Sequence, residues 1–159
     1  MLGILNETET EEMLLRQFIG RIGCYAEGIT YVVPISYTYD GKYIYAHARE
    51  GMKIEMMRKN PKLCFEVDEM KDMANWKSVV AWGEFEELTE TELRKEAFHK
   101  LHDRILPVIS SETTHLGAQW PFLSSDKNDM EACKIFFRIH LDKKTGRFET
   151  NTVAHDFSV

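Results

Sequence analysis

The stretch TYVVPISYTYDGKYIYAHA, residues 30–48, alternates apolar and polar side chains on both sides of a central Asp-Gly pair. Before the pair, every second residue from Tyr31 to Tyr39 would share one face of a strand, and Ser36 would lie on the other. Asp-Gly between two alternating runs is a strong signal for a β-hairpin. The stretch therefore predicts two antiparallel strands, over residues 30–39 and 42–48.

Four further strands and three helices are predicted around this hairpin. Alternating or short apolar runs indicate strands over residues 21–27, 61–69, 76–88 and 131–142. Two capping-box pairs, Thr8 with Glu11 and Thr89 with Glu92, predict helices over about 8–19 and from 89 to about 104. A short helix should follow the hairpin and end at Asn60-Pro61. Residues 105–130 show no clear period.

About six strands joined largely by tight turns predict a mainly β protein with flanking helices, in which an antiparallel sheet closes into a small barrel. We expect one domain over residues 1–159, with its core at about 15–150. The glycine-rich phosphate loops of Rossmann and P-loop proteins do not occur in the sequence.

Composition excludes several kinds of partner. The formal net charge is −6 with no basic tail, so no nucleic acid partner is expected. No apolar run is long enough to span a bilayer, and the N-terminus lacks the features of a signal peptide, so no membrane partner is expected. Three scattered cysteines suggest free thiols in the cytoplasm, with Cys64 as a buried core residue.

The segment REGMK, residues 49–53, places two cations at the start of the short helix, where the helix dipole disfavours positive charge. A bound anion would explain this arrangement, because the amides of Gly51, Met52 and Lys53 would point at it. Arg49 and Lys53 would add cationic contacts, which suits a phosphomonoester. The alternative is a solvated helix end on which Arg49 pairs with Glu50 or Glu55.

Two features of the predicted hairpin are relevant to where a ligand would bind. Pro34 cannot donate to a sheet, so its strand should lie at an edge or carry a bulge, and a bulge often brings ligand and backbone together. Ser36 faces the same way as Pro34. Ala46 and Ala48 share a face of the next strand, where small side chains either leave room for a flat ring or pack under a neighbouring helix.

The run GRIGCYAEGITYVVPISYTYDGKYIYAHAREGMKIEMMRKNPKLCFEVDE closely resembles the FMN-binding split-barrel family, which includes the pyridoxamine 5′-phosphate oxidases. The resemblance is closest to the nitroimidazole-resistance (Nim-type) branch. Later segments, SVVAWGEFEEL and FFRIHLDKKTGR, also fit, so that nearly all of residues 15–150 is covered. No single motif is unique, but their order and spacing together are specific.

The resemblance implies a six-stranded antiparallel split β-barrel that forms a homodimer, with FMN between the subunits. By position, Lys53 matches the lysine that binds the phosphate, beside Arg49, Gly51 and Met52. Ser78 falls where the oxidases have a glutamine that reaches the partner's FMN, and Trp82 shares its face. Two strands would run along the cofactor, one with Val33, Pro34, Ile35 and Ser36, the other with Tyr45, Ala46, His47 and Ala48.

The implied function is FMN-dependent reduction of a small acceptor such as a nitroaromatic, with NAD(P)H as the electron donor. His47 would be the catalytic proton donor beside the reduced flavin; alternatively it is a rim histidine bonded to a carbonyl. Met52 stands where many oxidases carry an arginine, and no Arg or Lys follows Arg147. We therefore expect no oxidation of pyridoxamine 5′-phosphate.

The other class of function is a non-catalytic module that binds flavin, deazaflavin or haem, with His47 or His140 as an iron ligand. His99 and His102 share a helix face, but no second ligand motif accompanies them, so no metal site is expected. The aromatic segment around Trp120, residues 115–122, could stack over a flavin, line a dimer interface or plug the barrel.

Overall fold

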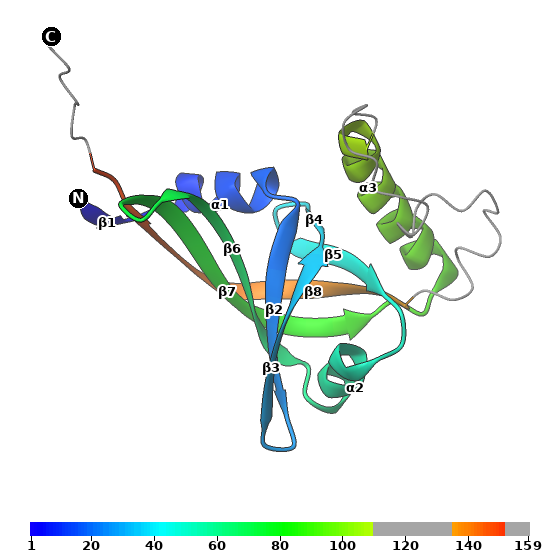
Figure 1. Ribbon diagram of the computed structural model, residues 1–159. Helices are drawn as coiled ribbons and strands as arrows, with labels where there is room; N and C mark the ends of the chain where they lie inside the picture. The colour runs from blue at the N-terminus through cyan, green and yellow to red at the C-terminus, as the bar shows by residue number, and fades with distance from the viewer. Residues whose placement is uncertain (110–134, 152–159) are drawn as a thin grey trace, which may run out of the picture.

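A computed structural model describes residues 1–109 and 135–151 (Figure 1). The segment around Trp120 lies outside the described residues. Within them the chain forms eight strands and three helices. These are β1 Leu2–Ile4, α1 Glu7–Arg16, β2 Ile19–Ala26, β3 Ile29–Ser36, β4 Thr38–Tyr39, β5 Tyr43–Ala48, α2 Met52–Lys59, β6 Lys62–Asp72, β7 Asn75–Glu87, α3 Thr91–Ile109 and β8 Ile135–Glu149.

All strands belong to one antiparallel sheet in the order β3-β2-β6-β7-β8-β5-β4, with β1 also paired to β8. The strands at the two ends of this order, β3 and β4, are separated in the chain by Tyr37 alone. The sheet must therefore curl until its two edges meet, which confirms the predicted mainly β, split-barrel fold. The expected count of six strands is wrong, because β1 is an additional strand and the predicted strand over 30–39 is interrupted at Tyr37.

The β4–β5 hairpin forms at the Asp-Gly pair, as the sequence predicts. Asp40 Oδ1 accepts from the backbone N–H groups of Lys42, at 3.0 Å, and Tyr43, at 2.8 Å. Gly41 has a φ of 93°, which a residue with a side chain rarely adopts. Partial burial opposes ionisation of Asp40, but the Tyr43 N–H, the Lys100 ammonium and the Lys42 N–H outweigh it and lower the pKa of its carboxyl.

The first helix begins differently from the prediction. Asn6, not Thr8, is its N-cap: the Asn6 side chain accepts from the Glu9 N–H, and the Glu9 carboxylate accepts from the Asn6 N–H, both at 2.9 Å. The expected Thr8–Glu11 capping box is therefore wrong. Glu11 instead accepts from the Tyr39 hydroxyl at 2.8 Å, which fastens α1 to β4.

Pro34 lies on an edge strand and not in a bulge. β3 pairs only with β2 within the described sheet, and the register runs from Ile19 opposite Ser36 to Ala26 opposite Ile29 without a shift. On an edge strand, the missing N–H of a proline can face away from the sheet, so no hydrogen bond between strands is lost. The interpretation that a bulge at Pro34 brings ligand and backbone together is wrong.

Alternation along the strands places apolar side chains inside the barrel, and α1 and α2 add further side chains to this core. Met13 and Leu14 of α1 and Ile54 and Met57 of α2 belong to this core. α3 packs outside it over a second cluster: Tyr45, Leu88, Ala97, Leu101 and Phe136. Among the described residues, no helix has the length and apolar character needed to cross a membrane.

Tyr37 occupies the junction between the two sheet edges. Its side chain is fully buried, and its hydroxyl donates to the Leu14 carbonyl at 2.7 Å. Its N–H donates to the Phe18 carbonyl at 3.1 Å, and its ring meets the Phe65 ring edge-on at 4.8 Å. Burial raises the pKa of this phenol, so it remains a hydrogen-bond donor. Tyr37 thus ties the closure of the barrel to α1.

Tyr37→Phe should lower the free energy of unfolding by about 1–3 kcal/mol, because the buried Leu14 carbonyl loses its donor while the ring contacts stay. Urea titration followed by circular dichroism measures the change. Tyr25→Phe is the matched control: Tyr25 is 53% exposed, and its loss should cost less than about 0.5 kcal/mol. Equal effects of the two variants would contradict the role of Tyr37.

Candidate anion-binding site

The candidate site lies where β5 ends and α2 begins. Gly51 is the N-cap of α2, and its carbonyl accepts from the N–H groups of Ile54, at 3.0 Å, and Glu55, at 3.1 Å. The N–H groups before Ile54 have no intrahelical acceptor by the geometry of a helix, and no side-chain cap is formed within the described residues. The amides of Gly51, Met52 and Lys53 therefore have the geometry that anion binding requires, and the predicted contact with an anion stays a prediction.

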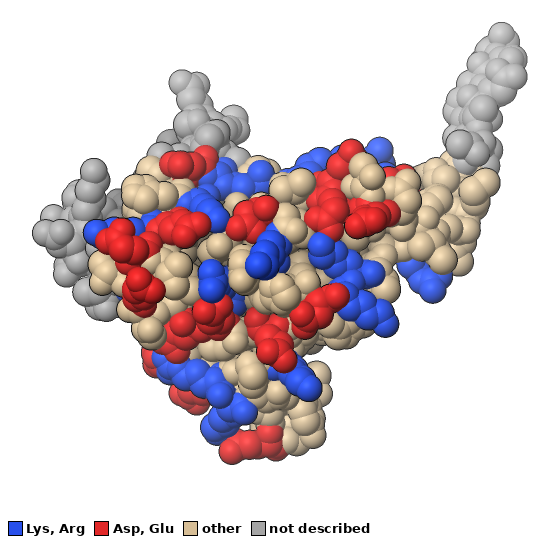
Figure 2. Space-filling view, turned by 180° about the vertical axis from the view of Figure 1, so that it is seen from behind, with Lys and Arg blue, Asp and Glu red and all other residues tan. Residues whose placement is uncertain are grey.

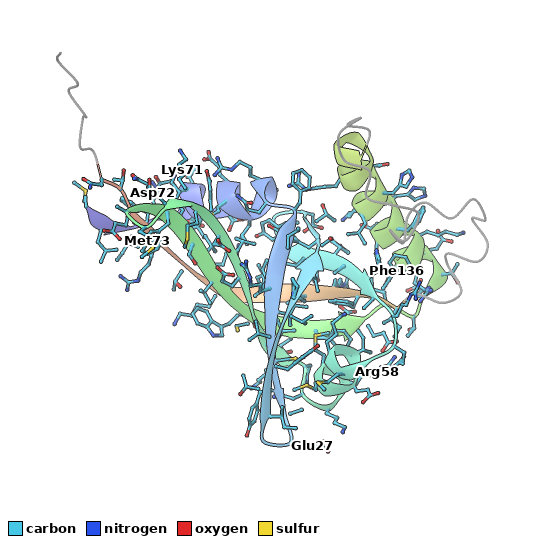
Figure 3. All side chains as sticks on the ribbon, in the orientation of Figure 1. Glu27, Arg58, Lys71, Asp72, Met73 and Phe136 are labelled. Carbon is cyan, nitrogen blue, oxygen red and sulfur yellow. The ribbon has the colours of Figure 1, made fainter. Side chains whose placement is uncertain are left out.

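Packing fixes the direction in which these amides point. α2 has eight residues, fewer than an isolated helix needs to be stable in water. Ile54 and Met57 are fully buried in the barrel core, and α2 contacts β2. Figure 3 shows α2 beside the β2–β3 hairpin, with Arg58 on the helix and Glu27 in the hairpin turn. The start of α2 is thus held rigidly to the sheet.

Among the described residues, no acidic side chain forms an ion pair with the two cations at this helix start. Arg49 is exposed and Lys53 is half-buried, and neither forms an ion pair with any residue among 1–109 and 135–151. The alternative of a pair between Arg49 and Glu50 or Glu55 does not hold within the described residues: Glu50 contacts Arg58 instead, and Glu55 forms no ion pair with Arg49. On the face seen in Figure 2, basic and acidic side chains are mixed, and no large patch of one sign is present on it.

Gly51 is not required by the fold. Its φ of 163° is extended backbone that any residue adopts, and a Cβ at this position would meet no atom within 4 Å. Packing and backbone strain therefore do not explain a glycine here. What the glycine provides is a helix N-terminus with open space in front of it.

The alanines of β5 face away from any such ligand. Ala46 is fully buried and Ala48 is 6% exposed, and both belong to the barrel core together with Ile54 and Met57 of α2. This placement favours the packing interpretation over room for a flat ring. Tyr45 is buried on the opposite face of β5 beneath α3, where Lys100 Nζ donates to its hydroxyl at 3.3 Å.

His47 shares that outward face of β5. It is partly buried, and its ring lies 5.9 Å from the ring of Phe136, at 59° to it. Arg94 Cζ of α3 lies over the same Phe136 ring, 5.3 Å from its centroid. His47 lies four residues before Gly51 in the chain, and the Phe136 ring that it contacts also contacts Arg94 in the first turn of α3. Its predicted catalytic role stays a prediction.

The remaining predicted residues divide between two faces of the sheet. Val33 and Ile35 point toward the core, whereas Pro34, Ser36, Ser78 and Trp82 line the outer face. Ser78 Oγ donates to Glu66 Oε1 at 3.2 Å, and Glu66 also accepts from Arg21 at 3.0 Å.

Trp82 lies in a shallow groove on this outer face. Trp82 is 42% exposed and stands opposite Cys64, which is half-buried. The groove has a volume of about 580 Å³ and is also lined by Gly23, Tyr25 and Val32. Cys64 is thus a groove residue and not the buried core residue that the sequence predicts; that position belongs to Cys24, at 2% exposure.

One contact of α2 was missed from the sequence. Arg58 forms a fork with Glu87 at the end of β7, with Nε to Oε2 at 2.7 Å and Nη2 to Oε1 at 2.9 Å, and its Nη1 also contacts Glu50. The Arg58 hydrogen bonds lower the pKa of the Glu87 carboxyl. The two residues are 29 positions apart, so no local sequence pattern could reveal the pair.

The other histidines do not form a metal site in the described residues. His102 stacks on Phe98 with ring centroids 5.5 Å apart, and its Nδ1 lies 3.6 Å from Asp103. His140 is exposed and lies 3.0 Å from Asp142. Within 1–109 and 135–151, no three His, Cys, Asp or Glu side chains converge to hold a metal ion.

Comparison with known proteins matches this chain to a family. The model of the pyridoxamine 5′-phosphate oxidase family matches residues 6–148. An uncharacterised protein of Rhizobium meliloti is 27% identical over 158 residues, covering 91% of this chain and 93% of that protein.

Two solved structures share the fold. An FAD-binding protein from Mesorhizobium loti superposes with a TM-score of 0.74 at 28% identity, covering 94% of this chain and 99% of the other. A candidate 5-nitroimidazole antibiotic resistance protein from Bacteroides thetaiotaomicron gives 0.69 at 19% identity, covering 93% of this chain and 87% of the other.

A substitution at the candidate site should leave the stability of the protein nearly unchanged. Lys53→Ala should change the free energy of unfolding by less than about 0.5 kcal/mol, because its ammonium has no partner in the described chain. Ile54→Ala, one residue further, should cost about 2–5 kcal/mol, because it empties a buried core position. Chemical denaturation measures both. A loss in Lys53→Ala as large as that in Ile54→Ala would show that Lys53 is a structural residue.

Proposed function

The chain belongs to the pyridoxamine 5′-phosphate oxidase family, and on that basis we propose that it is an FMN-dependent oxidoreductase that holds the cofactor phosphate at the start of α2. The observation that carries this proposal is the N-terminus of α2, which lacks a side-chain cap and lies between Arg49 and Lys53, two cations with no acidic partner among residues 1–109 and 135–151. The M. loti relative, which is an FAD-binding protein, supports a flavin as the ligand class.

The phosphate of FMN suits the chemistry of this site. A phosphomonoester carries up to two negative charges and three acceptor oxygens. The amides of Gly51, Met52 and Lys53 would donate to these oxygens, and Lys53 Nζ and the Arg49 guanidinium would add charge-assisted bonds. The open space at Gly51 lets a phosphate approach the backbone closely.

The flavin would supply the redox chemistry, taking a hydride from NAD(P)H and passing electrons to a small acceptor such as a nitroaromatic. The protein would supply position and a proton. His47 is the proposed proton donor, since imidazole titrates near neutral pH and His47 lies only four residues before Gly51. Its contact with Phe136 would hold the ring in one orientation.

The second candidate function is flavin binding without turnover, and the observation that favours it is the position of His47. A histidine packed on Phe136 beneath α3 can be a structural rim residue as well as a proton donor. Anaerobic mixing of the FMN-loaded protein with NADH or NADPH separates the two functions. Bleaching of the flavin absorbance, with reoxidation by a nitroaromatic, supports an enzyme, whereas a stable oxidised spectrum supports a binding protein.

We further propose that two copies of the chain complete the flavin site. Arg138 of β8 lies opposite Glu86 of β7 on one side and opposite Tyr45 of β5 on the other. Tyr45 is two residues before His47. Ser78 lies eight residues from Glu86, about 26 Å along the strand. The same chain's Ser78 is therefore far from the end of β5, whereas Ser78 of a second copy could reach the flavin if the groove around Trp82 is the contact surface.

Replacing Lys53 by Ala or Gln should weaken FMN binding roughly 10- to 150-fold, because a charge-assisted bond contributes about 1.5–3 kcal/mol. Riboflavin has no phosphate, so its affinity should barely change. Fluorescence quenching gives both dissociation constants. Lys71→Ala is the control, since this exposed lysine lies near the tip of the β6–β7 hairpin (Figure 3). An unchanged FMN constant, or an equal loss for riboflavin, would refute the phosphate site.

The FMN-loaded protein should be a dimer at micromolar concentration by light scattering. Trp82→Glu should shift it toward the monomer, because a charge would replace the aromatic side chain at the centre of the groove. Met73→Glu is the control, as Met73 is 91% exposed at the hairpin tip. A monomeric wild-type protein with FMN bound would rule out the two-copy site.

A further inference from the structure

Glu50 presents a difficulty for an anion site at α2. It directly precedes the N-cap Gly51, and the start of a helix attracts carboxylates as it attracts any anion. Glu50 is also the acidic residue adjacent in sequence to Arg49 and only three positions from Lys53. Left unrestrained, its carboxylate would compete with a bound phosphate for the same amides and cations.

The structure holds this carboxylate elsewhere. Arg58 sits two turns into α2 and uses Nε and Nη2 to grip both oxygens of Glu87, at 2.7 and 2.9 Å. A bidentate fork of this kind fixes the guanidinium plane. The remaining nitrogen, Nη1, contacts Glu50 Oε1. Glu87 is the last residue of β7. Arg58 therefore fixes the position of the Glu50 carboxylate relative to the barrel wall.

We propose that Arg58 is a positioning residue that restrains Glu50 and thereby keeps the start of α2 open for the flavin phosphate. This inference rests on the proposed function. It accounts for how the cations of this region pair: Arg58 binds the carboxylates of Glu50 and Glu87, and Arg49 and Lys53 are left without acidic partners in the described chain. Arg58 also neutralises Glu50, which lowers the negative potential at the site.

The neighbouring ion pair offers a matched control. Lys59 Nζ bonds Glu27 Oε2 at 2.8 Å and also ties α2 to the sheet, through the β2–β3 turn. This pair is exposed, like that of Arg58, but neither member contacts Glu50. If Arg58 acts only by anchoring α2, loss of Lys59 should resemble loss of Arg58.

The test is a double-mutant cycle with FMN and riboflavin dissociation constants as readouts. Arg58→Gln should weaken FMN binding roughly fivefold and leave riboflavin unchanged, because it releases a carboxylate toward a charged site. Adding Glu50→Gln should restore the FMN constant to within roughly twofold of wild type. Lys59→Gln should leave both constants unchanged.

A structural role alone predicts a different pattern. If the double variant binds FMN as poorly as Arg58→Gln, or if riboflavin affinity falls equally, the proposal is overturned. If Arg58→Gln does not fold, Arg58→Lys takes its place, because lysine keeps the positive charge but cannot form the fork. Failure of Glu50→Gln to restore FMN binding in that variant would likewise overturn the proposal. These outcomes are distinct from failure of the phosphate site itself, which would appear as an unaltered FMN constant in Lys53→Ala.

Discussion

The closure of the sheet at Tyr37 is the constraint on which the rest of the structure depends. The two end strands of the sheet, β3 and β4, are consecutive in the chain, and only this buried residue separates them. Its hydroxyl and N–H bind carbonyls at the end of α1 and just after it. In the closed sheet, α2 follows β5 and packs on β2 and on the barrel core before the chain enters β6. The direction of the α2 N-terminus, and hence the candidate site, follows from that packing.

The cations at the two ends of α2 differ in whether they are paired with acids, and the proposed function depends on this difference. The cations of its second half, Arg58 and Lys59, bond acids on β7 and in the β2–β3 turn. Those at its start have no such partners in the described chain. The protein has a net charge of −6, and charges more than about 8–10 Å away are largely screened at physiological salt. Anion binding must therefore rely on the groups at the helix start.

The sequence predicted the elements whose signals are local. The Asp-Gly hairpin is formed by Asp40 bonds to residues two and three positions on, and the start of α2 follows from a glycine before an apolar helix face. The first helix start was misplaced because Asn6 with Glu9 and Thr8 with Glu11 match the same spacing rule, and only the structure distinguishes them.

Features that depend on the closed barrel could not be predicted. The interruption at Tyr37 leaves the alternation of apolar residues unbroken, so periodicity alone gave one strand. The burial of Ala46 and Ala48 depends on which side of β5 faces the core, and the Arg58–Glu87 fork joins elements 29 residues apart. The split of the predicted flavin residues between two faces likewise emerges only when the strands are in register.

The most direct test of the central claim is calorimetry of the wild-type protein with FMN and with riboflavin, ligands that differ only by the phosphate. The account predicts that FMN binds at least roughly tenfold more tightly, since even one charge-assisted bond to the phosphate is worth that ratio. Equal affinity for the two ligands, or no binding of FMN, would contradict a phosphate site at the start of α2.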